Sequence, residues 1–179
     1  MLSRSIFRKF VATDFPELDK FFRFNPAYAD SCVVKRDMAG YDTFRRLCQI
    51  VGHWELNGYG WHGLFQHRTG ALLGIIGAEY NHFLRNAEFT LISSSIEAKT
   101  RLTWMLTYHY MLAREWENFG VDTYAIIAPE NLVCINLVEK CGSKFIKDDL
   151  YAEGSKGKLY KLDWQKADDR FRKSRVFGT

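Results

Sequence analysis

The stretch that decides the fold is NLVCINLVEKCG, which occupies residues 131–142. It predicts a helix over residues 131–141 that Gly142 closes, because glycine is the usual residue just beyond a helix end. The apolar residues 121–128 before this helix predict a strand. Two further strands are expected after it, at residues 144–147 and 158–162, so the last third of the chain is expected to run strand, helix, strand, strand.

The N-terminal part of the chain predicts one strand and two helices. The strand is expected at residues 7–12. Asp14 is expected to cap a helix over residues 14–24, with Pro16 in the first turn, where its missing N–H costs little. A second helix is expected at residues 41–51. The apolar residues assigned to the buried face of this helix are Phe44, Leu47, Cys48 and Val51.

The middle of the chain changes from helical to strand periodicity. Two apolar runs, residues 58–67 and 71–78, flank a Thr69-Gly70 turn and predict an antiparallel hairpin. A further strand is expected at residues 87–92. The strongest helix follows at residues 102–116 and is expected to end at Gly120. Its continuous apolar stripe consists of Leu102, Met105, Leu106, His109, Leu112, Ala113 and Trp116.

The complete order of elements is strand, two helices, three strands, helix, strand, helix and two strands. It predicts an α/β (α+β) fold in which a mixed sheet carries helices on both faces. A chain of 179 residues is long enough to bury one core. We expect a single domain over residues 1–165, followed by a solvated basic tail over residues 166–179.

The composition argues against several classes of protein. The net charge of +4 is too small to indicate nucleic-acid binding by itself. No apolar run approaches the ~18 residues of a membrane span. The four cysteines lack CxxC spacing, and the five histidines lack the spacing of a metal site. We therefore expect a cytoplasmic protein without a metal, a membrane or a nucleic acid as partner.

Two segments resemble the GNAT superfamily of acyltransferases, and most closely the subgroup that includes the ribosomal-protein N-terminal acetyltransferases. Members carry an Asn after the fifth strand, a Ser or Ala three residues later, and Glu-Lys-x-Gly at the helix end. Asn131, Glu139, Lys140 and Gly142 match this pattern, and Cys134 stands where members have Ser or Ala. The hairpin region, residues 54–77, is typical of the subgroup. The resemblance covers roughly residues 7–162 and implies a GNAT fold with a mostly antiparallel central sheet.

The resemblance implies that acetyl-CoA, or another acyl-CoA, is the co-substrate. In the family, a glycine-containing loop at the N-terminus of the long helix holds the CoA pyrophosphate through backbone N–H groups. The corresponding residues are Ala98, Lys99, Thr100 and Arg101, with Ala98 and Thr100 standing where glycines are expected. Small residues still expose their amides, and the two basic side chains can bind phosphate.

The resemblance also assigns roles in binding the thioester. Backbone amides on the fourth strand, near Phe89 and Leu91, are expected to polarise the thioester carbonyl. Asn131 is expected either to orient CoA or to cap its own helix.

Acyl transfer to an amine also requires a base that deprotonates the amine. Glu88, at the start of the fourth strand, matches an acidic position common in the subgroup and can serve as this base. The alternative interpretation is a solvated strand residue. Glu79, at the end of the preceding strand, is a weaker candidate.

The reaction further requires an acid that protonates the leaving thiolate. Many relatives use a Tyr seven residues after the helix Asn, but this position holds Val138. Cys134 can replace it, because a thiol with a pKa near ~8.5 can donate a proton. The alternative is a small buried cysteine packed under CoA. Tyr124 and Tyr151 are further candidates that the sequence does not rank.

The resemblance therefore predicts an N-acetyltransferase in which a primary amine attacks acetyl-CoA directly within a ternary complex. The acceptor is expected to be a peptide N-terminus, a lysine or a small amine, and the aromatic residues Trp54, Tyr59 and Trp61 either line its groove or belong to the core. Many relatives are dimers, so a homodimer is one expectation. The alternative is a catalytically silent GNAT-fold module for ligand sensing or protein interaction, which the glycine-poor loop and the missing Tyr favour.

Overall fold

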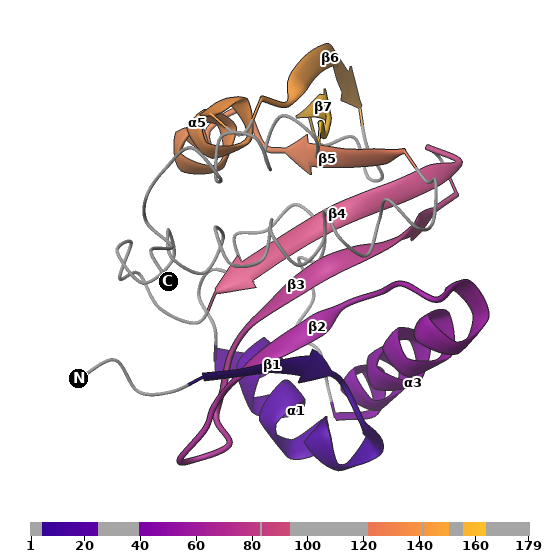
Figure 1. Ribbon diagram of the computed structural model, residues 1–179, viewed down its shortest axis with the longest axis vertical. Coiled ribbons are helices and arrows are strands. Elements are labelled where there is room, and N and C mark those ends of the chain that lie inside the picture. Colours follow the sequence, from indigo (N-terminus) through magenta and orange to yellow (C-terminus); the bar gives the residue numbers. More distant parts are fainter. Residues whose placement is uncertain are drawn as a thin grey trace, which may run out of the picture. The chain divides into compact units, whose positions relative to one another are not determined.

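The structure is a computed structural model that describes residues 5–24, 40–82, 84–93, 122–140, 142–150 and 156–163 (Figure 1). The predicted helix over residues 102–116 and the tail over residues 166–179 lie outside these ranges. The described elements, in chain order, are β1 (Ser5–Lys9), a 3-10 turn η1 (Ala12–Asp14), α1 (Phe15–Phe24), α3 (Gly40–Asn57), β2 (His62–Gln66), β3 (Leu72–Asn81), β4 (Asn86–Ser93), β5 (Thr123–Ile127), α5 (Leu132–Lys140), β6 (Lys144–Leu150) and β7 (Lys156–Lys161).

The strands form a seven-stranded sheet in the order β1-β2-β3-β4-β5-β7-β6. The pairs β1/β2, β2/β3, β5/β7 and β6/β7 are antiparallel, whereas β4 pairs with β5 in parallel. The sheet is thus mixed, which confirms the predicted fold class. Among the described residues, no helix is both long and apolar enough to cross a membrane.

The chain divides into two compact units. The first comprises Met1–Tyr80 and Phe89–Ile96, and the second comprises Asn81–Glu88 and Glu97–Thr179. The boundary crosses β4 between Glu88 and Phe89. The single domain expected over residues 1–165 stays a prediction.

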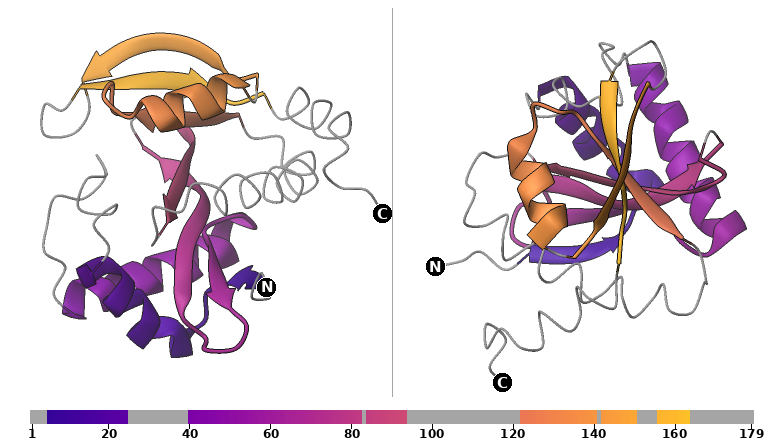
Figure 2. Two further views of the ribbon diagram at one scale, coloured as in Figure 1. Left: turned by 90° about the vertical axis from the view of Figure 1, so that its left-hand side faces the viewer. Right: turned by 90° about the horizontal axis from the view of Figure 1, so that it is seen from above.

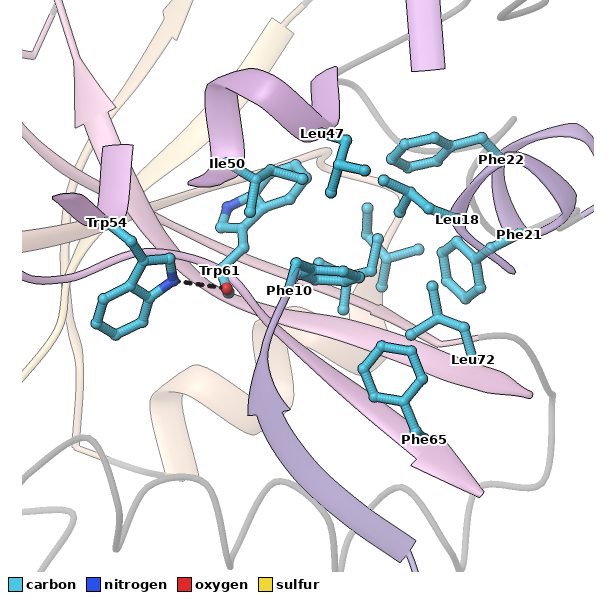
Figure 3. Close-up of a cluster of buried hydrophobic side chains, with 12 residues drawn as sticks. Phe10, Leu18, Phe21, Phe22, Leu47, Ile50, Trp54, Trp61, Phe65 and Leu72 are labelled. Atoms are coloured by element: carbon cyan, nitrogen blue, oxygen red, sulfur yellow. Dashed lines mark hydrogen bonds between the residues drawn. The ribbon is translucent and has the colours of Figure 1, made fainter. Parts of the chain in front are cut away.

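The core of the first unit lies between its two helices and its hairpin. Side chains from α1, α3, β2 and β3 gather in one buried cluster, so both helices cover the same face of the hairpin (Figures 1 and 3). The apolar residues of the two helices recur at helical spacing and those of the hairpin at strand spacing, because both sets face this cluster. The cluster consists of Phe10, Leu18, Phe21, Phe22, Leu47, Ile50, Trp54, Trp61, Phe65, Leu72, Ile75 and Ile92.

The buried face of α3 differs from the prediction. Phe44 is 52% exposed and Cys48 is exposed, although both were assigned to the core. The helix runs six residues further than residue 51 and buries Trp54, whose indole Nε1 donates a hydrogen bond to the backbone oxygen of Trp61 at 2.8 Å (Figure 3). This anchor selects the stripe Thr43, Leu47, Ile50 and Trp54, which also has helical spacing.

The start of the chain also differs from the prediction. β1 ends at Lys9 rather than at residue 12, because the chain turns into η1. α1 begins directly after Asp14, as expected. The described hydrogen bonds of the Asp14 carboxylate, however, are to residues that precede it in the chain rather than to the helix. The carboxylate accepts two hydrogen bonds from the Arg8 guanidinium, at 2.6 and 2.7 Å, and one from the Val11 N–H at 2.8 Å. Although burial acts in the opposite direction, these bonds lower the pKa of Asp14.

The aromatic residues around the hairpin belong to the core. Trp54, Tyr59 and Trp61 are each at most 6% exposed, which decides against a groove lined by them. Next to them, Gly77 has a φ of +155°, and its backbone lies against that of Gly60 and Trp61. A side chain at position 77 has no room, so this close approach requires glycine.

The second unit contains β5, β7 and β6 with helix α5 packed against them (Figure 2). α5 begins and ends as the sequence predicts. The Asn131 side-chain oxygen accepts the Cys134 N–H at 3.1 Å, which caps the N-terminus. At the other end, Gly142 has a φ of +87°, and the N–H groups of Gly142 and Ser143 bond to the carbonyls of Glu139 and Val138. This is the Schellman pattern.

Candidate functional site

Glu88, the predicted base, lies near the start of β4 and is half-buried. Its Oε2 accepts a hydrogen bond from Asn81 Nδ2 at 2.6 Å. Asn81 ends β3 and also accepts the backbone N–H of Leu84 at 3.1 Å through Oδ1. The carboxylate is therefore held by the turn between β3 and β4, which is a more specific setting than a solvated strand residue has.

The parallel register of β4 and β5 places Tyr124 beside Glu88. The register pairs Ala87 with Thr123 and Glu88 with Tyr124. Side chains of paired residues lie on the same face of a sheet, so Glu88 and Tyr124 are neighbours on one face. Ala87 and Thr123 are buried on the opposite face. The register thus brings the predicted base next to one of the two tyrosines considered as acids.

One strand further, Tyr124 pairs with Lys161 of β7 on the same face. Lys161 Nζ lies 2.7 Å from Asp122 Oδ2 and 6.0 Å from the centre of the Tyr124 ring. The hydrogen bond to Asp122, more than the nearby negative charges, raises the pKa of Lys161. Glu88, Tyr124 and Lys161 therefore lie side by side on three neighbouring strands, and the last of them carries an ammonium group.

Helix α5, which carries Cys134, packs on the other face of β5 and β7. Tyr160 pairs with Ala125 on that face, and the Tyr160 hydroxyl donates to Glu139 Oε1 of α5 at 2.9 Å. Burial, followed by the hydrogen bond to Glu139, raises the pKa of Tyr160 to about 12. The Cys134 side chain is a half-buried thiol. In the second unit, the Glu88 side chain thus lies on one face of the sheet, and helix α5, which carries Cys134, packs on the opposite face.

Glu79, the weaker base candidate, belongs to the first unit and is engaged in an ion pair. Arg46 Nη2 of α3 lies 2.5 Å from Glu79 Oε1, and both side chains are only 20–25% exposed. The same guanidinium covers the Trp61 ring at 4.1 Å from its centre. The Glu79 carboxylate is therefore engaged by Arg46 within the first unit.

Among the described side chains, no group of three or more His, Cys, Asp or Glu is placed to hold a metal ion. Sequence reasoning missed Asn81, which contacts the predicted base directly. The available signal was an Asn at the end of a strand followed by a short turn, because asparagine side chains often bond to turn backbones.

Comparison with solved structures shows which known fold this is. A ribosomal-protein-S5-alanine acetyltransferase from Vibrio fischeri superimposes with a TM-score of 0.71 at 14% identity, over 92% of this chain and 97% of its own. A protein assigned to the GNAT acetyltransferases, from Bordetella pertussis, gives 0.70 at 18% identity, over 89% and 96%. The chain has the GNAT fold. A chimeric spermidine N-acetyltransferase from Vibrio cholerae and hSSAT gives a TM-score of 0.63 at 18% identity, over 94% and 100%.

These identities are low, so the likeness concerns the fold alone. No family model matches the sequence, and no curated protein matches it either. The GNAT fold therefore rests on the arrangement of the elements, and the fold by itself does not establish an activity.

The residues predicted to bind the co-substrate are distributed over three parts of this GNAT fold. On β4, Phe89 and Leu91 are half-buried, whereas Thr90 and Ile92 are buried. Phe89 and Leu91 thus lie on the face of β4 opposite to Thr90 and Ile92. Asn131 caps α5, which matches one of its two predicted roles. Ala98, Lys99, Thr100 and Arg101 lie outside the described residues, and their role stays a prediction.

Proposed function

We propose that this chain is an N-acetyltransferase that transfers the acetyl group of acetyl-CoA to a primary amine within a ternary complex. The observation that carries the proposal is the setting of Glu88 on β4 of a GNAT fold, bonded to Asn81 and registered beside Tyr124. The named neighbours act on a ribosomal-protein alanine and on spermidine, so a peptide N-terminus and a small polyamine are the first acceptors to consider.

In this proposal Glu88 removes a proton from the incoming ammonium group, directly or through one water molecule. The amine nitrogen then bonds to the acetyl carbonyl carbon and the carbon–sulfur bond breaks. The amine loses its second proton, and the departing thiolate takes one up. Overall, R–NH3+ and acetyl–S–CoA give R–NH–acetyl, CoA–SH and one proton.

Of the three candidates for the acid, Tyr151 lies outside the described residues, and two side chains with described positions compete for the role. Tyr124 is favoured by its position beside Glu88, and Cys134 by its place in the motif of the helix that follows β5. Phenol and thiol groups can both act as proton donors in general acid catalysis. Replacing each one separately, as Tyr124→Phe and Cys134→Ala, distinguishes them, because loss of the acid lowers the rate of thiolate departure without weakening amine binding.

The chain's own groups also have to hold the co-substrate. Backbone amides near Phe89 and Leu91 are proposed to polarise the acetyl carbonyl, and residues 98–101 are proposed to bind the pyrophosphate through backbone N–H groups and two basic side chains. Acetyl-CoA supplies the activated thioester, and the chain supplies orientation and proton transfer.

The test measures binding and turnover separately. Calorimetry with acetyl-CoA, CoA and a longer acyl-CoA shows whether the nucleotide binds. Release of CoA thiol is then followed with spermidine, an N-terminal alanine peptide and lysine as acceptors. We expect Glu88→Gln to lower kcat/KM by about 10²- to 10⁴-fold, and Glu79→Gln, the matched control, to lower it far less.

The outcomes separate the alternatives. Binding without turnover on any amine would indicate the catalytically silent module. Turnover that Glu88→Gln leaves unchanged would keep the activity but remove Glu88 as its base. Absence of both binding and turnover would overturn the proposed function.

A further inference from the structure

The turn between β3 and β4 fixes the orientation of one side-chain amide. Asn81 Oδ1 lies 3.1 Å from the backbone nitrogen of Leu84, and Asn81 Nδ2 lies 2.6 Å from Glu88 Oε2. A backbone N–H can only donate, and an ionised carboxylate can only accept. The amide oxygen must therefore face Leu84 and the amide NH2 group must face Glu88. Either contact alone would fix the orientation of the Asn81 amide, and the two agree.

We propose that Asn81 is the positioning residue of the active site, which holds the Glu88 carboxylate in its reactive rotamer and favours its ionised form. This inference rests on the proposed function of Glu88 as the base. A hydrogen bond donated to a carboxylate favours the charged state, and a short charge-assisted bond restricts rotation of the acceptor. Because the turn holds the donor, the base is oriented before any amine arrives.

The groups around Glu88 agree with this role. Its neighbour across β5 is Tyr124, and Lys161 follows one strand further on the same face. His82 lies in the same turn as Asn81. Changes at Asn81 replace none of these three side chains, and Asn81→Ala adds no charge beside them, so this variant tests the bond to Glu88 with the fewest other electrostatic changes.

A single substitution separates positioning from turn closure. In Asn81→Asp, one carboxylate oxygen can still accept the Leu84 N–H, but the group facing Glu88 changes from a donor to a second carboxylate. Two carboxylates at this distance share one proton, which disfavours the ionised base. Because the turn keeps its hydrogen bond to the Leu84 N–H, the change acts mainly at the contact with Glu88.

The experiment records kcat/KM against pH, with the best acceptor from the amine panel, for the wild-type chain and three variants. For Asn81→Asp we expect the acid limb of the profile to move up by at least about one pH unit. For Asn81→Ala we expect a smaller upward shift and a loss of about tenfold in kcat/KM, the effect of one hydrogen bond to a charged group. The matched control is Asn86→Ala, which removes a 3.3 Å bond to the Leu84 carbonyl in the same turn. It should leave the acid limb in place.

A double variant provides the second readout. In Asn81→Asp combined with Glu88→Gln, donor and acceptor exchange places, so the bond between the two positions can form again. We expect the thermal midpoint to recover relative to Asn81→Asp, while turnover stays at the level of Glu88→Gln alone.

Each outcome decides something. An active enzyme whose acid limb does not move in Asn81→Asp would overturn the positioning role and leave the proposed function intact. A double variant with restored turnover would overturn it as well, because the carboxylate would not need to be at position 88. A wild-type chain inactive on every amine would overturn the proposed function, and this inference with it.

Discussion

Replacing Gly77 by alanine should destabilise the first unit strongly, because its position combines two separate constraints. A Cβ atom at Gly77 would collide with the carbonyl oxygen of Gly60 and lie 2.6 Å from the Trp61 Cα. These are backbone atoms, which cannot swing aside as a side-chain tip can. In addition, the φ of +155° is one that residues with a side chain rarely adopt.

The magnitude follows from these two constraints. Forcing an extra methyl group into a packed site costs about 1–3 kcal/mol, and a disfavoured backbone conformation costs about 1–3 kcal/mol. Since the backbone relaxes both together, we expect a loss of about 2–4 kcal/mol in the free energy of unfolding. With a urea m-value of about 2 kcal/mol/M, the denaturation midpoint falls by about 1–2 M.

Gly52 provides the matched control for this change. It lies within α3, and a Cβ atom added there meets nothing within 4 Å. Alanine in a helix interior is favoured over glycine by about 0.5–1 kcal/mol, so Gly52→Ala should raise the urea midpoint. The same substitution is thus expected to have opposite signs at two positions. The reasoning would be refuted if Gly77→Ala unfolded within about 0.5 kcal/mol of wild type, the range of a neutral surface change.

Three further predictions concern single side chains. Burial, and then the charge of Lys9, lowers the pKa of His62 to about 4. Because the unfolded chain protonates near pH 6.5, stability should fall as the pH drops from about 6.5 to 4, by roughly 2–3 kcal/mol in urea titrations, and His62→Gln should flatten this dependence. Tyr160→Phe should cost about 1 kcal/mol in thermal unfolding by removing the bond to Glu139, whereas Glu139→Gln, which keeps an acceptor, should cost less. Asn131→Ala should cost about 1 kcal/mol through the lost cap of α5, whereas Asn131→Asp should retain most of the stability.

The sequence predicted the existence of the described elements better than their faces. The hairpin, β4 and α5 lie where apolar periodicity and turn residues place them, because these signals are local. The face of α3 was predicted wrongly because two apolar stripes with helical spacing pass through Leu47. The choice between them depends on Trp54 reaching the Trp61 carbonyl, a contact between two elements.

The candidate site was predicted in part for the same reason. Glu88 was predicted as the base because it matches an acidic position at the start of the fourth strand in the resembled subgroup, and this role stays a prediction. Its neighbours cannot be predicted in this way, because Tyr124 becomes adjacent only through a parallel register between strands separated by 29 residues of sequence. The bond from Asn81 depends on the conformation of a turn, in which Arg85 adopts a φ of +51°. Contacts of this kind follow from the tertiary fold rather than from local patterns.

The motif that made the sequence recognisable is explained by the stability of the fold. Asn131 caps α5, Glu139 accepts the Tyr160 hydroxyl of β7, and Gly142 supplies the positive φ that ends the helix. Each matching residue with a described contact therefore has a structural task that a protein without activity would also need. The motif is thus evidence for the GNAT fold and neutral between an active enzyme and a silent module. That distinction depends on residues outside the motif, the Asn81–Glu88 pair and residues 98–101, and the variants at Asn81 and Glu88 test the first of these.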